Sequence, residues 1–181
     1  MAEQGRPFVP VGIAVLTVSD SRSAADDRSG DTLAERISAA GHRLAGRAIV
    51  KDDASAIRDA VEAWSRDPAV DVVITTGGTG FTGRDVTPEA LEPLFEKRME
   101  GFAAVFHRIS FDKIGTSTIQ SRATGGIVNQ TFVFVLPGSP GACRDAWDGI
   151  LAAQLDYRHR PCNFVEIMPR LDEHLKRGGP G

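Results

Sequence analysis

Cysteine is scarce in this sequence, which holds only Cys143 and Cys162 among its 181 residues. Two cysteines are too few for a disulfide framework or a zinc site, so a reducing, cytoplasmic setting is predicted. No apolar run approaches the ~20 residues that span a membrane, and the first residues lack the pattern of a signal peptide. We therefore expect a cytoplasmic protein that has no membrane partner.

A surplus of basic charge is also missing, because the formal net charge is -3 and the pI is near 5.8. This balance argues against a protein that coats nucleic acid, although a few cations and backbone amides suffice to hold a small anion. Apolar residues make up 41% and charged residues 25% of the chain, which is typical of a globular protein. We expect one domain over residues 1–181, with flexible ends at 1–10 and 172–181.

Runs of apolar, β-branched residues alternate with segments of helical periodicity along most of the chain. This alternation predicts βαβ units and a mainly parallel sheet, to which a hairpin around Asn129-Gln130 adds an antiparallel edge. Ser29 or Thr32 is expected to cap the first helix, and Thr87 the third. Strands are predicted at 11–18, 44–50, 70–76 and within 127–138, and helices at 31–40, 54–66, 88–98, 101–111 and 139–155.

Small, polar or glycine-rich residues follow each of the strands that we expect to be parallel. These segments are 19–21, 51–53, 75–80 and 137–140. Ligands of open parallel sheets bind beyond the carboxyl ends of the strands, where such segments come together. The sequence therefore predicts a ligand site at that edge of the sheet.

The stretch TTGGTGFTGRDVTPEA, residues 75–90, resembles two phosphate-binding motifs without matching either. Gly78, Gly80 and Gly83 satisfy G-x-G-x-x-G, but no helix is expected to begin before Pro88. In a dinucleotide site the helix begins directly at the glycine motif, and an acidic residue ends the next strand. Neither feature is found in this sequence. The P-loop interpretation fails as well, because an Arg-Asp pair follows Gly83 where Lys-Ser/Thr is required.

What remains is a glycine-rich turn whose backbone N–H groups can converge on a phosphate, with Asp85 at its far edge. From the residues alone, two interpretations of Asp85 stay open. It holds a Mg²⁺ ion that bridges a phosphate, or it caps the turn before the next helix. Arg122 likewise meets a phosphate or forms a structural salt bridge. The cluster of Asp26, Asp27 and Asp31 is explained by loop solvation and the helix dipole.

The segments TVSDS, TTGGTG, RDVTPEA, MEGF and LPGSPGA, together with the Ser121-Arg122 pair, resemble the MogA/MoaB molybdopterin-binding family. The resemblance runs from about Val11 to Leu155, and the segment LDYRHRPCNF is similar to the MoaB branch. It implies a three-layer α/β/α fold and self-association as a homotrimer or hexamer. It also implies Mg-ATP-dependent adenylylation of molybdopterin with release of pyrophosphate. A non-catalytic molybdopterin carrier of the same pathway is the alternative, and a nicotinamide oxidoreductase is a third.

By this resemblance, Asp52 and Asp85 are the catalytic residues and the Mg²⁺ ligands, with Asp53 as the competitor of Asp52. The remaining residues that the resemblance places around ATP and molybdopterin follow the same strands. They are Asp20, Ser21, Thr76, Gly77, Gly78, Thr79, Gly80, Ser121, Pro137, Gly138, Ser139 and Pro140.

Overall fold

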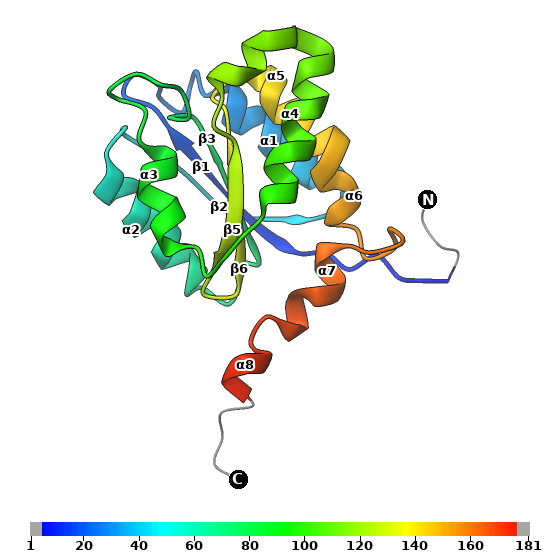
Figure 1. The fold of residues 1–181 in the computed structure, drawn as a ribbon. Coiled ribbons are helices and arrows are strands. Elements are labelled where there is room, and N and C mark those ends of the chain that lie inside the picture. Colours follow the sequence, from blue (N-terminus) through cyan, green and yellow to red (C-terminus); the bar gives the residue numbers. More distant parts are fainter. Residues whose placement is uncertain (1–4, 177–181) are drawn as a thin grey trace.

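A computed structural model describes residues 5–176 and places a mixed sheet between two layers of helices (Figure 1). Among the described residues the strand order is β2-β1-β3-β6-β5-β4. Strands β2, β1, β3 and β6 are parallel, β5 pairs antiparallel with β6, and β4 pairs antiparallel with β5. The predicted three-layer, mainly parallel fold with an antiparallel edge is confirmed. The strands are β1 (Gly12–Val18), β2 (Arg43–Val50), β3 (Val72–Thr76), β4 (Lys97–Arg98), β5 (Thr124–Val128) and β6 (Thr131–Leu136).

Helices cover both faces of the sheet (Figure 1). One face carries α1 (Arg28–Ala39), α4 (Glu100–Ile114), α5 (Pro140–Ala146), α6 (Ala152–Gln154) and α7 (Phe164–Ile167), and the other carries α2 (Ala54–Ser65) and α3 (Thr87–Leu91). A π-helical segment, Trp147–Leu151, joins α5 to α6, and α8 (Glu173–Lys176) ends the described chain. No helix within residues 5–176 is long and apolar enough to cross a membrane.

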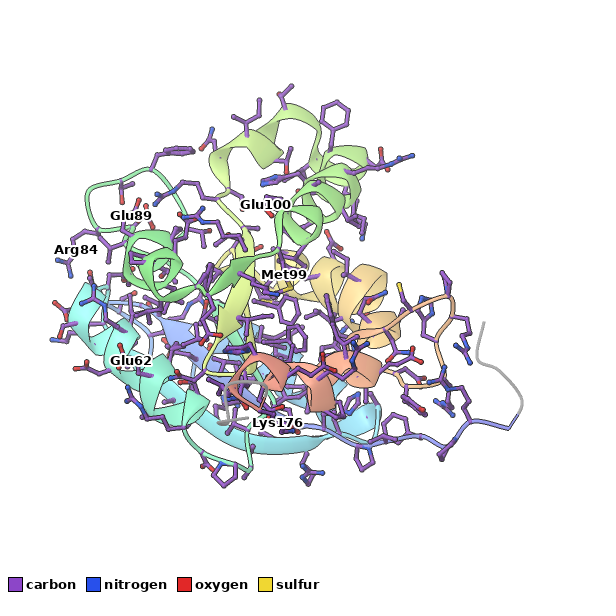
Figure 2. All side chains as sticks on the ribbon, turned by 60° about the horizontal axis from the view of Figure 1, so that its bottom comes forward. Glu62, Arg84, Glu89, Met99, Glu100 and Lys176 are labelled. Atoms are coloured by element: carbon purple, nitrogen blue, oxygen red, sulfur yellow. The ribbon has the colours of Figure 1, made fainter. Side chains whose placement is uncertain are left out.

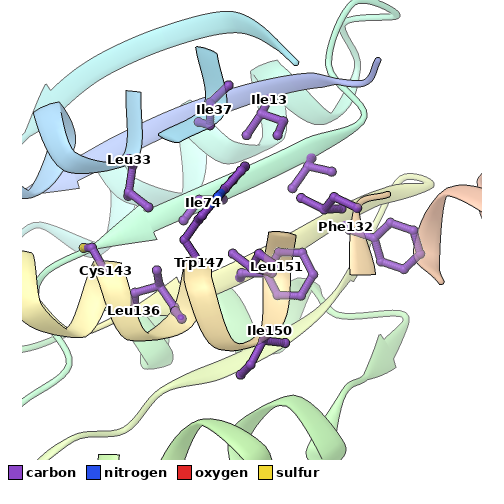
Figure 3. Packing of buried hydrophobic residues seen from close by; sticks show 14 of the residues in the cluster. Ile13, Leu33, Ile37, Ile74, Phe132, Leu136, Cys143, Trp147, Ile150 and Leu151 are labelled. Atoms are coloured by element: carbon purple, nitrogen blue, oxygen red, sulfur yellow. The ribbon is translucent and has the colours of Figure 1, made fainter. Parts of the chain in front are cut away.

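The central strand β1 is buried along its whole length because side chains on both of its faces meet helices. Ile13 and Val15 belong to the larger core. Figure 3 shows Ile13 in this core with Leu33 of α1 and Trp147. Leu16 points to the opposite core, which α2 and α3 cover. Full burial of such a side chain contributes roughly 1.5–3 kcal/mol, so continuous apolar runs specify strands that are covered on both faces.

The parallel strands bring their carboxyl ends to one edge of the sheet. In the register of the sheet, Val18 lies beside Val50, Thr17 beside Thr76, and Thr76 beside Leu136. The polar segments that follow these strands are therefore neighbours, as the sequence predicts. The predicted hairpin turn is also confirmed, because Asn129 and Gln130 both have positive φ, at 45° and 67°.

The predicted helix over 88–98 is wrong in its second half. Helix α3 ends at Leu91, a short 3-10 turn spans Glu92–Leu94, and Lys97–Arg98 pair with β5 as the edge strand β4. Pro93 lacks a backbone N–H and cannot continue an α-helix, which explains the early end. Thr87 does not cap α3 either, because the cap position is Val86 and the Thr87 hydroxyl donates to Gly77 O at 2.9 Å.

The cap predicted for the first helix at Ser29 or Thr32 is also wrong. Asp27 caps α1 by accepting from Gly30 N–H at 3.0 Å, and its side chain is fully buried. The same carboxylate accepts from Thr17 Oγ1 at 2.8 Å and from Arg47 at 2.9 Å, so it joins α1 to β1 and β2. Loop solvation therefore does not explain Asp27.

Parts of both ends that we predicted to be flexible fall outside the described residues, at 1–4 and 177–181. In the described part, Arg6 pairs with Glu166 at 3.2 Å and lies 3.7 Å from the centre of the Tyr157 ring. The flexibility of 1–10 and 172–181 stays a prediction.

Candidate functional site at the carboxyl ends of the strands

Residues 77–86, which we call the glycine loop, join β3 to α3. Gly77 has φ of +106°, and a Cβ there would lie 2.2 Å from Val18 O, so only glycine fits between β3 and β1. The Gly77 N–H donates to Leu136 O at 3.0 Å, and the Thr87 N–H donates to Gly78 O at 3.0 Å. These bonds fix the start of the loop between the ends of β1, β6 and α3.

Asp52 follows β2 and faces the glycine loop, whereas Asp53 does not. The Asp53 carboxylate caps α2 by accepting from Ala56 N–H at 2.8 Å. The Asp52 N–H donates to Asp20 Oδ1 at 3.2 Å, and a Cβ on Gly78 would lie 3.1 Å from Asp52 Oδ1. Burial and the negative charges of Asp20 and Asp85 raise the pKa of the Asp52 carboxyl above its ordinary value.

Asp85 lies at the far end of the same loop, and its side chain binds back to Thr82 within the loop. Its Oδ2 accepts from the Thr82 hydroxyl at 2.6 Å and from the Thr82 N–H at 2.9 Å. These bonds hold the pKa of the Asp85 carboxyl below its ordinary value, so the group is ionised near neutral pH. Asp85 thus makes the turn contacts that the capping interpretation predicts. Its other carboxylate oxygen accepts neither of these two bonds.

Asp20, after β1, forms an ion pair across the edge of the site with Arg84. Two guanidinium nitrogens donate to the two carboxylate oxygens, each at 2.9 Å, and this pairing holds the pKa of Asp20 below its ordinary value. Figure 2 shows Arg84 and Glu89 on the side of the molecule where α2 and α3 lie. Ser21 is exposed beside Asp20, and its N–H donates to Ser19 Oγ at 3.3 Å.

The segment after β6 forms the opposite wall, and much of it makes structural contacts. The Thr76 hydroxyl is buried and donates to Pro137 O at 2.8 Å, whereas Ser139 caps α5 by accepting from Ala142 N–H. Pro140 occupies the first turn of α5.

Gly138 O accepts from Arg22 Nη2 at 2.8 Å and from Ser29 Oγ at 2.9 Å. Neither Arg22 nor Ser29 is predicted from the sequence as part of this site, because only the fold brings them to Gly138.

Ser121 lies just before β5, in a segment that contacts the glycine loop at Thr79. The N–H of the next residue, Arg122, donates to Thr79 O at 3.1 Å, so this segment is tied to the glycine loop. Thr79 is buried, and so is the Ser121 hydroxyl oxygen, for which no hydrogen-bond partner is found among the described residues. Gly80 lies against Asp85, since a Cβ there would be 2.7 Å from Oδ2.

The carboxylates of this edge suit a magnesium ion that is shared with a phosphate ligand. The charges of Asp20 and Asp85 act on Asp52, so the site holds concentrated negative charge of the kind that a dication balances. In residues 5–176 no group of three or more His, Cys, Asp or Glu side chains is placed to hold a metal alone. Magnesium is commonly held by one or two carboxylates, with water and phosphate oxygens as the other ligands.

A recess of about 580 Å³ lies elsewhere on the molecule, between α4 and the helical segment that follows α5. It contains none of the residues that the sequence predicts for the site. The residues that line it are largely apolar and carry no carboxylate, lysine or arginine: Met99, Gly101, Phe102, Val105, Gly149, Ile150, Ala153, Gln154, His159 and Phe164. Phosphate and metal chemistry therefore fits the strand-end edge better than this recess.

A parallel α/β sheet with a glycine loop and facing carboxylates at its carboxyl edge defines a ligand-binding α/β protein, and comparisons with known proteins identify the family. Residues 14–157 match the family described as "Probable molybdopterin binding domain". Molybdenum cofactor biosynthesis protein B of Escherichia coli is 51% identical over 164 residues, which cover 91% of this chain and 96% of that protein. The Bacillus subtilis protein of the same name is 42% identical over 142 residues, covering 78% of this chain and 84% of that one.

Solved structures agree with these relatives. A crystal structure of molybdenum cofactor biosynthesis protein B superposes with a TM-score of 0.83 at 38% identity, covering 93% of this chain and 99% of that one. The tungsten cofactor synthesizing protein MoaB from Pyrococcus furiosus gives 0.69 at 31% identity, covering 94% and 98%. The chain belongs to the molybdopterin-binding domain family, among the MoaB/MogA-type proteins of molybdenum cofactor biosynthesis.

Proposed function

We propose that this protein is a molybdopterin adenylyltransferase, which joins the terminal phosphate of molybdopterin to the α-phosphorus of ATP and releases pyrophosphate. The observation that carries the proposal is the position of two carboxylates against the glycines of the loop, Asp52 beside Gly78 and Asp85 beside Gly80. The names of the family and its relatives supply the pterin substrate. The site supplies carboxylates, backbone amides and an exposed cation for the phosphates of both substrates.

Adenylyl transfer between two phosphates needs positioning and charge neutralisation more than a protein nucleophile. The attacking phosphate is already anionic, so no strong general base is required. Asp52 and Asp85 would hold Mg²⁺, which neutralises phosphate charge when it is bound. The N–H groups of the glycine loop would orient phosphate oxygens, because glycines let a backbone approach a ligand closely.

Arg84 is the one cationic residue within the glycine loop. It is largely exposed and is held by Asp20 across the edge of the site. A phosphate competes with Asp20 for such a guanidinium, since both present paired oxygens to it. We propose that Arg84 and Asp20 border the nucleotide phosphates.

The test is a turnover assay with molybdopterin, ATP and Mg²⁺, in which pyrophosphate release is measured. We expect release in the wild type, no release without Mg²⁺, and at least a ~100-fold loss in Asp85→Asn, because the carboxylate acts on transition-state charge. Asp53→Asn is the matched control and should keep full turnover. Pterin binding without any pyrophosphate release would favour the non-catalytic carrier instead.

The family resemblance also leads us to propose that the protein self-associates as a homotrimer or a hexamer. Light scattering coupled to size-exclusion chromatography measures the mass directly, against 19.4 kDa for one chain. A mass of three or six chains is the expected result, and a monomer at micromolar concentration would contradict it.

A further inference from the structure

Arg122 precedes β5 and belongs to none of the strand-end loops, yet it makes a dense set of contacts with the glycine loop. Its Nε donates to Gly80 O at 3.0 Å and to Thr79 O at 3.3 Å, and its Nη2 donates to Asp85 O at 3.1 Å. Its backbone N–H also donates to Thr79 O. One residue thus holds the carbonyl groups of both the middle and the end of the loop.

These contacts fix the direction in which the loop presents its N–H groups. A trans peptide unit is planar, and its C=O and N–H point to opposite sides. Because the carbonyls of Thr79 and Gly80 turn to Arg122, the N–H groups of Gly80 and Phe81 point away from the cation. A loop that binds an anion through its amides needs nearby carbonyl dipoles to be turned away from the ligand.

We propose that Arg122 is a positioning residue, which turns the carbonyls of the glycine loop toward its guanidinium so that the loop amides and the Asp85 carboxylate keep a ligand-binding geometry. The ligand-binding part of this inference rests on the proposed function. Arginine suits the position better than lysine, because its rigid fork donates to several acceptors at once, whereas a lysine ammonium is a single point charge.

The ion pair between Arg122 and Glu89 of α3 does not explain the position by itself. Glu89 is more than half exposed, and ion pairs of this kind contribute little to stability. The carbonyl contacts would remain if Glu89 lost its charge. Glu89→Gln is therefore the matched control, since it removes the charge of the partner and leaves the bonds from Arg122 to the loop.

Hydrogen exchange followed by mass spectrometry tests the positioning in the full chain without any ligand. In Arg122→Gln we expect the peptide that carries the amides of Thr82, Asp85 and Thr87 to exchange about tenfold faster, because lost anchoring hydrogen bonds ease local opening. Arg122→Lys should lie between this variant and the wild type, and Glu89→Gln should stay within about twofold of the wild type. Peptides of β1 and β3 should not change in any variant.

Isothermal titration with Mg-ATP gives the second readout. We expect the Kd of Arg122→Gln to rise about tenfold, in step with the loop exchange, while Glu89→Gln keeps the wild-type affinity. Unchanged loop exchange in Arg122→Gln overturns the proposal, and so does faster exchange spread evenly over the whole chain. Faster exchange confined to the loop, in a protein whose wild type binds no Mg-ATP, supports the positioning role and contradicts the proposed function instead.

Discussion

The carboxylate of Asp52 lies directly against Gly78, so that a Cβ at residue 78 would be 3.1 Å from Asp52 Oδ1 and 2.3 Å from Thr87 Oγ1. The same glycine has φ of +67°, a conformation that other residues adopt with strain. The contact joins the loop after β2 to the loop after β3, and it leaves no room for a side chain between them.

Gly78→Ala should therefore destabilise the protein and weaken Mg-ATP binding together. Strain at positive φ and the close contact with Thr87 together cost about 1–3 kcal/mol, which chemical denaturation measures as a lower midpoint. Gly83→Ala in the same loop is the control, because a Cβ there meets nothing within 4 Å. Equal behaviour of the two variants would show that Gly78 is not packed as described.

Replacing Asp52 and replacing Asp53 should have opposite consequences. Asp52→Asn removes a charge that neighbouring carboxylates disfavour, so stability should hold or rise while Mg²⁺-dependent ATP binding is lost. Asp53→Ala removes the cap of α2 and should cost about 1 kcal/mol without changing Mg-ATP affinity. Calorimetry of unfolding measures the change in stability, and calorimetry of binding measures the affinity for Mg-ATP. Loss of Mg-ATP binding in Asp53→Ala, with binding kept in Asp52→Asn, would show that Asp53 and not Asp52 is the metal ligand.

Replacing Asp27 should destabilise the fold more than replacing an exposed polar residue. Its buried carboxylate joins Thr17, Arg47 and the first turn of α1, so Asp27→Ala should cost roughly 3 kcal/mol by leaving these donors without an acceptor. The neighbouring Asp26 is exposed, and Asp26→Ala should leave the denaturant midpoint close to that of the wild type. Denaturant midpoints measure both, and similar midpoints would contradict a structural role for Asp27.

Stability should fall below neutral pH because of His42. Its ring is buried, its Nδ1 accepts from Val11 N–H at 3.2 Å, and burial lowers the pKa of the imidazole below its ordinary value. The unfolded chain then binds the proton more readily, so stability that is present above about pH 6.5 declines as the pH falls, by at most about 1.4 kcal/mol per pH unit. His42→Gln, which keeps an acceptor, should flatten the pH dependence of Tm between pH 5 and 7, and an unchanged slope would exclude His42 as its cause.

The sequence predicts the parts of this molecule that depend on local patterns. Apolar runs identify the buried parallel strands, the hairpin turn falls at Asn129-Gln130, and the strand ends converge as expected. The choice of Asp52 over Asp53 came from resemblance alone. In the fold, Asp53 is engaged as the cap of α2, which leaves Asp52 to face the glycine loop.

Features that depend on distant contacts were not predictable in the same way. Lys97–Arg98 follow a helical pattern and become a strand only because β5 is available to pair with them. The sequence does not decide whether Arg122 meets a phosphate or forms a structural salt bridge. Its contacts with Thr79, Gly80 and Asp85 exist only after the sheet has brought the start of β5 to the glycine loop.

The position of the metal in a crystal grown with Mn²⁺ and a non-hydrolysable ATP analogue tests directly whether Asp52 and Asp85 hold the ion. We expect an anomalous peak for Mn²⁺ between these two carboxylates, in contact with phosphate oxygens, with no contact to Asp53. A metal bound elsewhere, or a nucleotide whose phosphates lie away from the glycine loop, would contradict this expectation.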